Sequence, residues 1–195
     1  MQLTREIDRV GAGMKILWPG LLLLGMTAAC GEKPSQDKPA PAATDWTSWT
    51  VADTGFGPIT IGMTPEQANA AVGGALQLPP GTTTDCAYAT HRGVDSLLFM
   101  VEQGKIVRIE VRRHDIPSAE GARVGDSEAR IQQLYPGRVR VSPHKYTAGH
   151  YLTVVPPPPD TVGHPYRLIF ETDGAAVVSF RGGALPQVEY VEGCS

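Results

Sequence analysis

The 195-residue chain has few cysteines, little basic charge and no long uninterrupted apolar run. Its 17 Lys and Arg residues are outnumbered by 20 Asp and Glu residues, which gives a formal net charge of −3. This balance disfavours a nucleic-acid-binding protein, whose affinity rests on basic side chains that neutralise phosphates. The apolar stretch over residues 16–29 is shorter than the ~20 residues of a membrane-spanning helix, and Pro19 interrupts it. We therefore predict no nucleic-acid partner and no transmembrane helix.

The sequence also lacks recognisable motifs for catalysis, a cofactor or a metal. No two of its five histidines lie four residues apart, the spacing that places two metal ligands on one helix face. The glycines are too widely spread for a phosphate-binding loop, and no nucleophile elbow is present. We predict a non-enzymatic protein with no cofactor and no metal. A remote alternative is an enzyme with an unrecognised site near His144 and His150, which flank two tyrosines.

The N-terminal part is typical of an exported protein. Residues 16–29 are apolar, follow a lysine and end in small side chains before Cys30, as secretory signals do. We predict a signal peptide over residues 1–29, with Met14 as the more natural start. Residues 27–30, Thr-Ala-Ala-Cys, resemble the lipobox of bacterial lipoproteins. The resemblance implies that Cys30 is lipidated and that the protein is lipid-anchored at the outer membrane, facing the periplasm. The alternatives are an ordinary cleaved signal and a retained anchor.

A proline-rich segment follows the cysteine. Residues 31–44 contain three prolines and few apolar side chains, without helical or strand periodicity. We expect residues 30–44 to be the lipidated cysteine and a disordered Pro/Ala-rich tether. The folded part then begins near residue 45 and holds about 150 residues, which suits one domain or two small halves that share a core.

Two similar patterns divide the folded part into halves, residues 45–120 and 121–195. Residues 64–67, Thr-Pro-Glu-Gln, combine an N-cap, a proline at N1 and a capping box, and Ser127 caps a corresponding helix in the second half. Each helix pattern precedes a strand hairpin, the second with an Asp-Gly turn at 173–174. We predict an α+β fold of two tandem helix-then-antiparallel-strand units that form one curved sheet with the helices packed on one face.

The first helix entry resembles that of a known family. Residues 61–68, Ile-Gly-Met-Thr-Pro-Glu-Gln-Ala, resemble the helix-entry motif of SmpA/BamE-type outer-membrane lipoproteins, and the doubling resembles the tandem repeat of the β-lactamase inhibitory protein. The resemblance covers most of residues 57–182. It implies a lipoprotein or secreted setting, and it brings no catalytic residues because neither group is enzymatic.

Cys86 and Cys194 are the remaining cysteines once Cys30 is lipidated. An even pair in an exported chain most often forms a disulfide. We predict that bond, and the alternative is two unpaired buried thiols. A zinc site would need more ligands than this pair and scattered histidines supply.

Strand alternation over residues 106–111 predicts one sheet face packed on the helices and one open face. The helix-packed side chains are Val107, Ile109 and Val111. The open side chains are Arg108, Glu110 and Arg112. A longer insertion in the second half adds tyrosines and a histidine, and Tyr and Arg are enriched among residues that dominate interface energetics. The predicted partner-binding residues are Arg108, Arg112, Tyr146, His150 and Tyr151.

These observations lead to a function hypothesis. We expect a lipid-anchored periplasmic protein-binding module, such as an envelope assembly accessory. Its partners would be the membrane, through the lipid, and another protein. The alternative, from the resemblance to the β-lactamase inhibitory protein, is an inhibitor of a secreted or periplasmic hydrolase such as a β-lactamase.

Overall fold

The computed structural model describes residues 45–81, 85–157 and 163–194. The predicted signal peptide, the lipidation site Cys30 and the tether lie outside the described residues. The chain divides into two units, and all of the described residues belong to the second, Pro39–Ser195. Within the described ranges, no helix has the length and apolar character needed to cross a bilayer.

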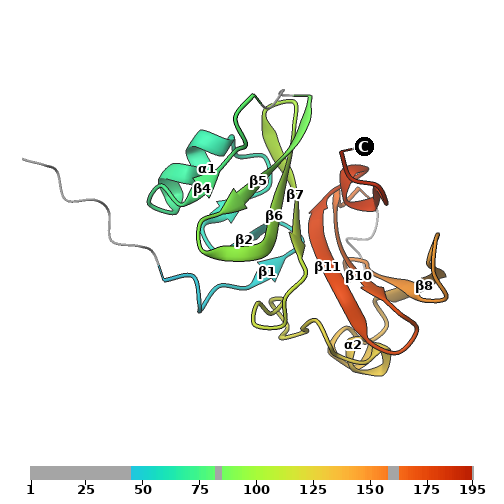
Figure 1. The fold of residues 1–195 in the computed structure, drawn as a ribbon. Helices are drawn as coiled ribbons and strands as arrows, with labels where there is room; N and C mark the ends of the chain where they lie inside the picture. The colour runs from blue at the N-terminus through green and yellow to red at the C-terminus, as the bar shows by residue number, and fades with distance from the viewer. Residues whose placement is uncertain (1–44, 82–84, 158–162, 195) are drawn as a thin grey trace, which may run out of the picture. The chain divides into compact units, whose positions relative to one another are not determined.

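Eight antiparallel strands form the main sheet (Figure 1). Their order across the sheet is β4-β5-β6-β7-β11-β10-β9-β8, so two runs of four consecutive strands meet where β7 pairs with β11. The first run is β4 (Leu76–Gln77), β5 (Cys86–His91), β6 (Val94–Glu102) and β7 (Lys105–Val111). The second run is β8 (Val139–Pro143), β9 (His150–Val154), β10 (Tyr166–Thr172) and β11 (Val177–Ala184). Strands β4 and β8 are therefore the two edges of this sheet.

A smaller sheet and short helices complete the described fold. The smaller sheet consists of β1 (Val51–Ala52), β2 (Gly55–Phe56) and β3 (Ile59–Thr60). The helices are α1 (Pro65–Ala71), α2 (Glu128–Leu134) and the 3-10 turn η1 (Gln187–Glu189). The predicted capping box is confirmed, because the Gln67 N–H donates to Thr64 Oγ1 at 3.2 Å and the Thr64 N–H donates to Gln67 Oε1 at 2.9 Å. Ser127 caps α2 in the predicted way, by accepting the Arg130 N–H at 3.2 Å.

The predicted α+β fold class is wrong, because the protein is mainly β. The two α-helices have seven residues each, so each is only about 10 Å long and cannot cover one face of an eight-stranded sheet. Gly73, in the left-handed region at φ 66°, follows the C-cap of α1 and stops that helix. Pro136 follows the C-cap of α2 and prevents its continuation. The helix-then-strand units expected for residues 45–120 and 121–195 are therefore not the architecture. The smaller sheet shares the covering of the core with the helices, through Val51, Phe56 and Ile59.

The hydrophobic core lies on one face of the main sheet, which we call the core face. Aromatic rings from several elements meet there. The ring centroids of Phe56 and Phe99 are 6.3 Å apart, those of Tyr135 and Phe170 are 5.8 Å apart, and those of Phe170 and Phe180 are 5.3 Å apart. Burying an apolar side chain of this size contributes roughly 1.5–3 kcal/mol. The core thus fixes which strand residues turn inward, and the alternate residues form the opposite, outer face.

Strand β7 follows the predicted alternation only at its second half. Ile109 and Val111 are fully buried in the core, as expected. Val107 is half-buried and outside the core, and Ile106 takes its place. The pairing shifts between Met100 and Val101 on β6, which leaves Val107 as an extra residue on β7. Such a bulge reverses the alternation on one side of it.

The end of the chain covers part of the outer face. We call residues 185–194 the C-terminal segment, and Figure 1 shows it beside the end of β11. Its Val188 is fully buried. The predicted disulfide is confirmed: Cys86, at the start of β5, is bonded to Cys194, with the two Cα atoms 5.4 Å apart. The outer face is consequently not open over its whole area.

His91, the last residue of β5, is expected to make the fold sensitive to acid. Its side chain is buried, Nδ1 lies 3.0 Å from the Arg92 carbonyl oxygen, and Nε2 has no hydrogen-bond partner among the described residues. Burial lowers the pKa of His91 below its ordinary value of 6.5, against the weaker effect of the Arg92 carbonyl. As the pH falls through about 6.5, the unfolded chain binds a proton before the folded one does, so stability is lost on the acid side.

Replacing this histidine should weaken that dependence. His91→Phe is expected to reduce the loss of unfolding free energy between about pH 7 and pH 5, because the variant has no imidazole to protonate at this site. Urea denaturation across that range measures it. His114→Phe is the matched control, because His114 is exposed. An identical pH slope for wild type and His91→Phe would contradict the prediction.

Candidate functional site

A pocket of about 210 Å³ lies on the outer face, where strands of the second run meet the C-terminal segment. We call it the outer-face pocket. Leu152 and Val154 of β9 turn into the core, so the alternate residues Tyr151 and Thr153 turn toward the pocket. The full lining is Ser142, Tyr151, Thr153, Ile169, Arg181, Glu189 and Val191. Four strands and the C-terminal segment thus converge on one cavity.

The Tyr151 ring is a fixed wall of this pocket. The His144 ring stacks on it at 4.5 Å between centroids and 24° between planes, and the Arg181 guanidinium lies 5.8 Å from its centroid. His144 is itself held, because its Nδ1 accepts the N–H groups of Tyr146 and Thr147 at 3.1 and 3.2 Å. The Tyr151 hydroxyl is buried without a hydrogen-bond partner in the part of the chain that the structure describes. A ring held in this way binds a partner at little cost in side-chain entropy.

Two charged side chains line the pocket: Arg181, which is neutralised by an ion pair, and Glu189, which is exposed. Arg181 is buried, pairs with Glu171 and donates through Nε to the Val188 carbonyl oxygen at 2.6 Å. Burial raises the pKa of Glu171, but the Arg181 charge and hydrogen bonds from Arg181 and Ser179 outweigh it and hold the pKa below its ordinary value. Both members of the pair are therefore charged and compensate each other. Because Arg181 is compensated and the Glu189 carboxylate also lines the pocket, a neutral or apolar group suits it better than an anion.

The structure separates the predicted partner-binding residues. Tyr151 lines the outer-face pocket. Tyr146 is 60% exposed, and its hydroxyl hydrogen-bonds to Glu192 of the C-terminal segment. His150 turns to the opposite side of β9 from Tyr151, where its Nδ1 lies 2.8 Å from Glu128 Oε1 on α2. Tyr146 and Tyr151 therefore remain candidates on one side of the molecule, and His150 does not share the pocket.

Two of the side chains predicted to be open lie beneath the C-terminal segment. Arg108 is 3% exposed and Glu110 is 6% exposed. Arg108 donates to the carbonyl oxygens of Gln187 and Tyr190 at 2.9 and 2.6 Å. The prediction of Arg108 as a partner contact is therefore wrong, because the chain's own end occupies that surface. Arg112 has 61% of its side chain exposed and does not line the outer-face pocket.

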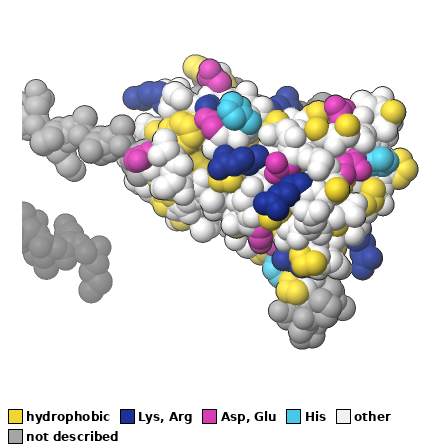
Figure 2. Space-filling model, turned by 90° about the horizontal axis from the view of Figure 1, so that it is seen from below, with side chains coloured by type: hydrophobic (Ala, Val, Ile, Leu, Met, Phe, Trp, Pro, Cys, Tyr) yellow, Lys and Arg dark blue, Asp and Glu magenta, His cyan; other side chains and the backbone are white. Residues whose placement is uncertain are grey.

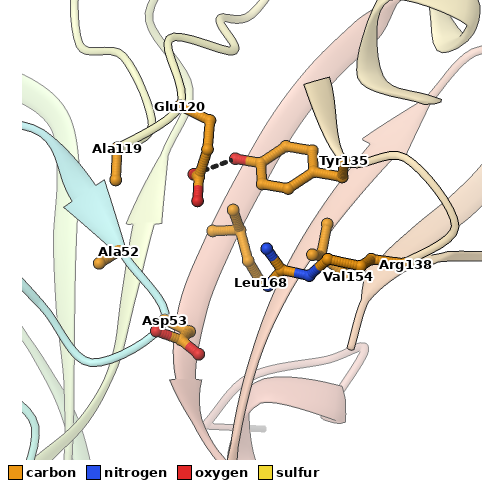
Figure 3. A pocket seen from close by; sticks show the side chains of 8 residues that line it. All are labelled: Ala52, Asp53, Ala119, Glu120, Tyr135, Arg138, Val154 and Leu168. Carbon is orange, nitrogen blue, oxygen red and sulfur yellow. Dashed lines mark hydrogen bonds between the residues drawn. The ribbon is translucent and has the colours of Figure 1, made fainter. Parts of the chain in front are cut away.

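A second, smaller pocket of about 50 Å³ opens on the core side, between β1 and the strands β9 and β10. Figure 3 shows Glu120 and Arg138 pointing into one gap that Asp53 borders. The Tyr135 hydroxyl donates to Glu120 Oε2 at 2.7 Å and lies 2.8 Å from Ser118 Oγ. Burial raises the pKa of Tyr135, with the Glu120 carboxylate adding to the effect. Tyr135 therefore remains a hydrogen-bond donor at neutral pH, and the volume suits a water-sized group rather than a substrate.

The histidine site considered as a remote alternative is not assembled. His144 stacks on Tyr151 on the outer face, whereas His150 contacts Glu128 on the core side. Burial raises the pKa of Glu128, but hydrogen bonds from Thr172 and His150 outweigh it and bring the pKa below its ordinary value. In the described ranges, no three His, Cys, Asp or Glu side chains converge as metal ligands. The two histidines thus serve separate local contacts.

Of the residues that line the outer-face pocket, the sequence prediction named Tyr151 and none of the other six. Ile169, Arg181, Glu189 and Val191 are brought to Tyr151 by strand pairing and by the return of the C-terminal segment. The sequence order does not show these approaches.

The surface seen from below in Figure 1 carries Lys and Arg side chains next to Asp and Glu, without a continuous patch of one sign (Figure 2).

Comparisons with known proteins assign no family. No family model matches the chain, and a search of the curated proteins finds no match. Among solved structures the chain is similar to the uncharacterized protein YfeY from Escherichia coli, with 17% identity and a TM-score of 0.44. The match covers 69% of this chain and 99% of that one. The chain therefore has a distant structural neighbour, and this similarity carries no functional assignment.

Proposed function

We propose that the protein is a protein-binding module that takes one apolar side chain of its partner into the outer-face pocket. The observation that carries this proposal is the pocket itself, with its fixed aromatic wall and its compensated Arg181. Its volume of about 210 Å³ is below the roughly 300–1,000 Å³ typical of small-molecule sites. A single side chain inserted from a larger partner fits that volume better than a whole small ligand.

The surroundings of the pocket support a protein partner. Tyr146 and Lys145 stand at the exposed side of the C-terminal segment, where both contact Glu192. Tyr, Trp and Arg dominate the energetics of protein interfaces, and exposed polar side chains form their rims. A pocket that receives an anchor side chain, with tyrosine nearby, has the composition of such an interface.

The proposal includes the setting expected from the N-terminal sequence. Lipidation of Cys30 would tether the domain at the outer membrane, facing the periplasm, and residues 31–44 would give it reach. The protein would then act as an accessory that binds another envelope protein, without catalysis and without nucleic acid. The support for this setting is the lipobox-like sequence of residues 27–30.

Site-specific photo-crosslinking in cells tests the binding surface. A photoreactive benzoylphenylalanine at Ser142, an exposed position at the pocket, is expected to form a discrete adduct with a partner protein. The same amino acid at Glu66, exposed on α1, is the matched control and should form none. Adding Thr153→Trp, which fills the pocket, should remove the Ser142 adduct. Adducts from Glu66 in the absence of any from Ser142 would place binding elsewhere.

A further inference from the structure

Strand β8 presents a free edge next to the outer-face pocket. It pairs with β9 on one side and has no strand on its other side among the described residues. The opposite edge of the sheet, β4, has only two residues, whereas β8 has five. Val141 in its middle is 50% exposed. An edge of this kind can accept the backbone of another extended segment.

The alternation of hydrogen-bonded and non-hydrogen-bonded pairs between β8 and β9 determines which backbone groups of β8 point away from the sheet. The Val155 N–H donates to the Arg138 carbonyl oxygen at 3.0 Å, and the His144 N–H donates to the Gly149 carbonyl oxygen at 2.9 Å. Because hydrogen-bonded pairs alternate along an antiparallel ladder, residues 140 and 142 also direct their backbone groups at β9. Val139 and Val141 therefore direct their N–H groups outward. Pro143 has no N–H, so it ends this row of donors.

The side chains of β8 add a charge requirement. Arg140 pairs with Thr153 and Ser142 pairs with Tyr151, so both side chains lie on the outer face. Arg140 is exposed and makes no ion pair within the described part of the chain. A strand added beside β8 would place one side chain opposite Arg140. Its next side chain on the same face would lie opposite Ser142, at the rim of the pocket. An acidic residue suits the first position and a long apolar residue the second.

We infer that the partner binds as an extended segment that pairs with Val139 and Val141 of β8, with an acidic residue opposite Arg140 and an aromatic residue reaching past Ser142 into the outer-face pocket. This inference rests on the proposed function and names the chemistry of the partner at the same site. A second copy of this chain is a poorer occupant. Antiparallel pairing of two β8 strands about Val141 would set Arg140 against Ser142, which offers no carboxylate.

Synthetic peptides test this inference directly. The probe is an alternating Thr/Val peptide with a central phenylalanine and glutamate two positions away on both sides, which serves either strand direction. Its control carries lysine at the two glutamate positions. We expect the glutamate peptide to bind and the lysine peptide not to bind, as measured by fluorescence anisotropy. The bound glutamate peptide should slow amide hydrogen exchange at Val139 and Val141. Arg140→Glu should reverse the preference in favour of the lysine peptide, a gain of binding that loss of folding cannot imitate.

Backbone variants separate the edge from the pocket. Val141→Pro removes one N–H and should weaken the glutamate peptide by about tenfold or more, whereas Val141→Thr keeps the N–H and should bind nearly as wild type. Peptide binding that Thr153→Trp blocks but Val141→Pro leaves intact would overturn the strand pairing and leave the proposed pocket standing. Failure of both peptides to bind, or dimerisation of the protein through β8, would also overturn the inference. The crosslinks from Ser142 then decide the proposed function independently.

Discussion

Replacing both Cys86 and Cys194 with alanine is expected to lower the free energy of unfolding by about 4–5 kcal/mol at most, the value that the chain-entropy model gives for a loop of this size. The bond joins residues 108 positions apart, so in the unfolded state it restricts residues 86–194. Urea denaturation of the double variant measures the loss. Wild type in the presence of reductant should approach the same value, and reductant should leave the variant unchanged.

The folded state loses a local restraint as well. Tyr190 is the last residue of the C-terminal segment whose backbone bonds to Arg108. The disulfide holds the residues that follow it. We therefore expect amide hydrogen exchange in the double variant to rise most near its end. A decrease below about 1 kcal/mol would contradict the prediction, because it would show that Arg108 and Arg181 hold the segment and that the crosslink adds little.

The sequence predicted local events better than the architecture. The Thr64 capping box and the Ser127 cap depend on residues within one helical turn, so the pattern alone was sufficient. The smaller sheet could not be predicted in this way. Its strands have two residues each, which is too short for any alternation to appear. Gly55 also has a tertiary role, because a Cβ there would lie 2.3 Å from the Ile59 carbonyl oxygen.

The covering of the outer face had a signal in the sequence. Ala89 of β5 belongs to the core and Ala87 is buried on the same side of the strand, so Cys86 and Tyr88 alternate onto the outer face. A disulfide from Cys86 to Cys194 therefore requires the chain end to lie on that face. The identities of the groups beneath it were not predictable, because Arg108 and Glu110 have the composition of an exposed strand face. Their burial follows from tertiary contacts: Arg108 donates to the C-terminal segment, and Glu110 accepts from Arg108 and Tyr88.

Arg108→Ala is expected to lower the free energy of unfolding by about 3–5 kcal/mol, the range for removing one partner of a buried ion pair. Arg108 Nε and Nη2 donate to Glu110 Oε1 at 3.0 and 2.5 Å, and Nη2 lies 3.1 Å from the Tyr88 hydroxyl. Burial, with the hydrogen bond to Glu110, raises the pKa of Tyr88 to about 12, so this tyrosine stays a neutral donor. The variant leaves the Glu110 carboxylate buried without its guanidinium. It also removes the Arg108 donor from the carbonyl oxygens of Gln187 and Tyr190, of which Gln187 keeps the Tyr190 N–H as a second donor.

Arg112→Ala is the matched control, because Arg112 reaches the same carboxylate at 3.5 Å from a side chain that is 61% exposed. Because the Arg112 guanidinium is solvated and lies 3.5 Å from the carboxylate, its pair contributes about 1 kcal/mol or less, so this variant should unfold close to wild type in urea. The paired change Arg108→Met with Glu110→Leu removes both charges together and should recover much of the stability lost in Arg108→Ala, since no buried charge is then left uncompensated. Equal losses for Arg108→Ala and Arg112→Ala would contradict the assignment of Arg108 as the buried anchor of the C-terminal segment. That segment forms one wall of the outer-face pocket through Glu189 and Val191. Arg108→Ala should therefore weaken partner binding, although Arg108 itself does not line the pocket.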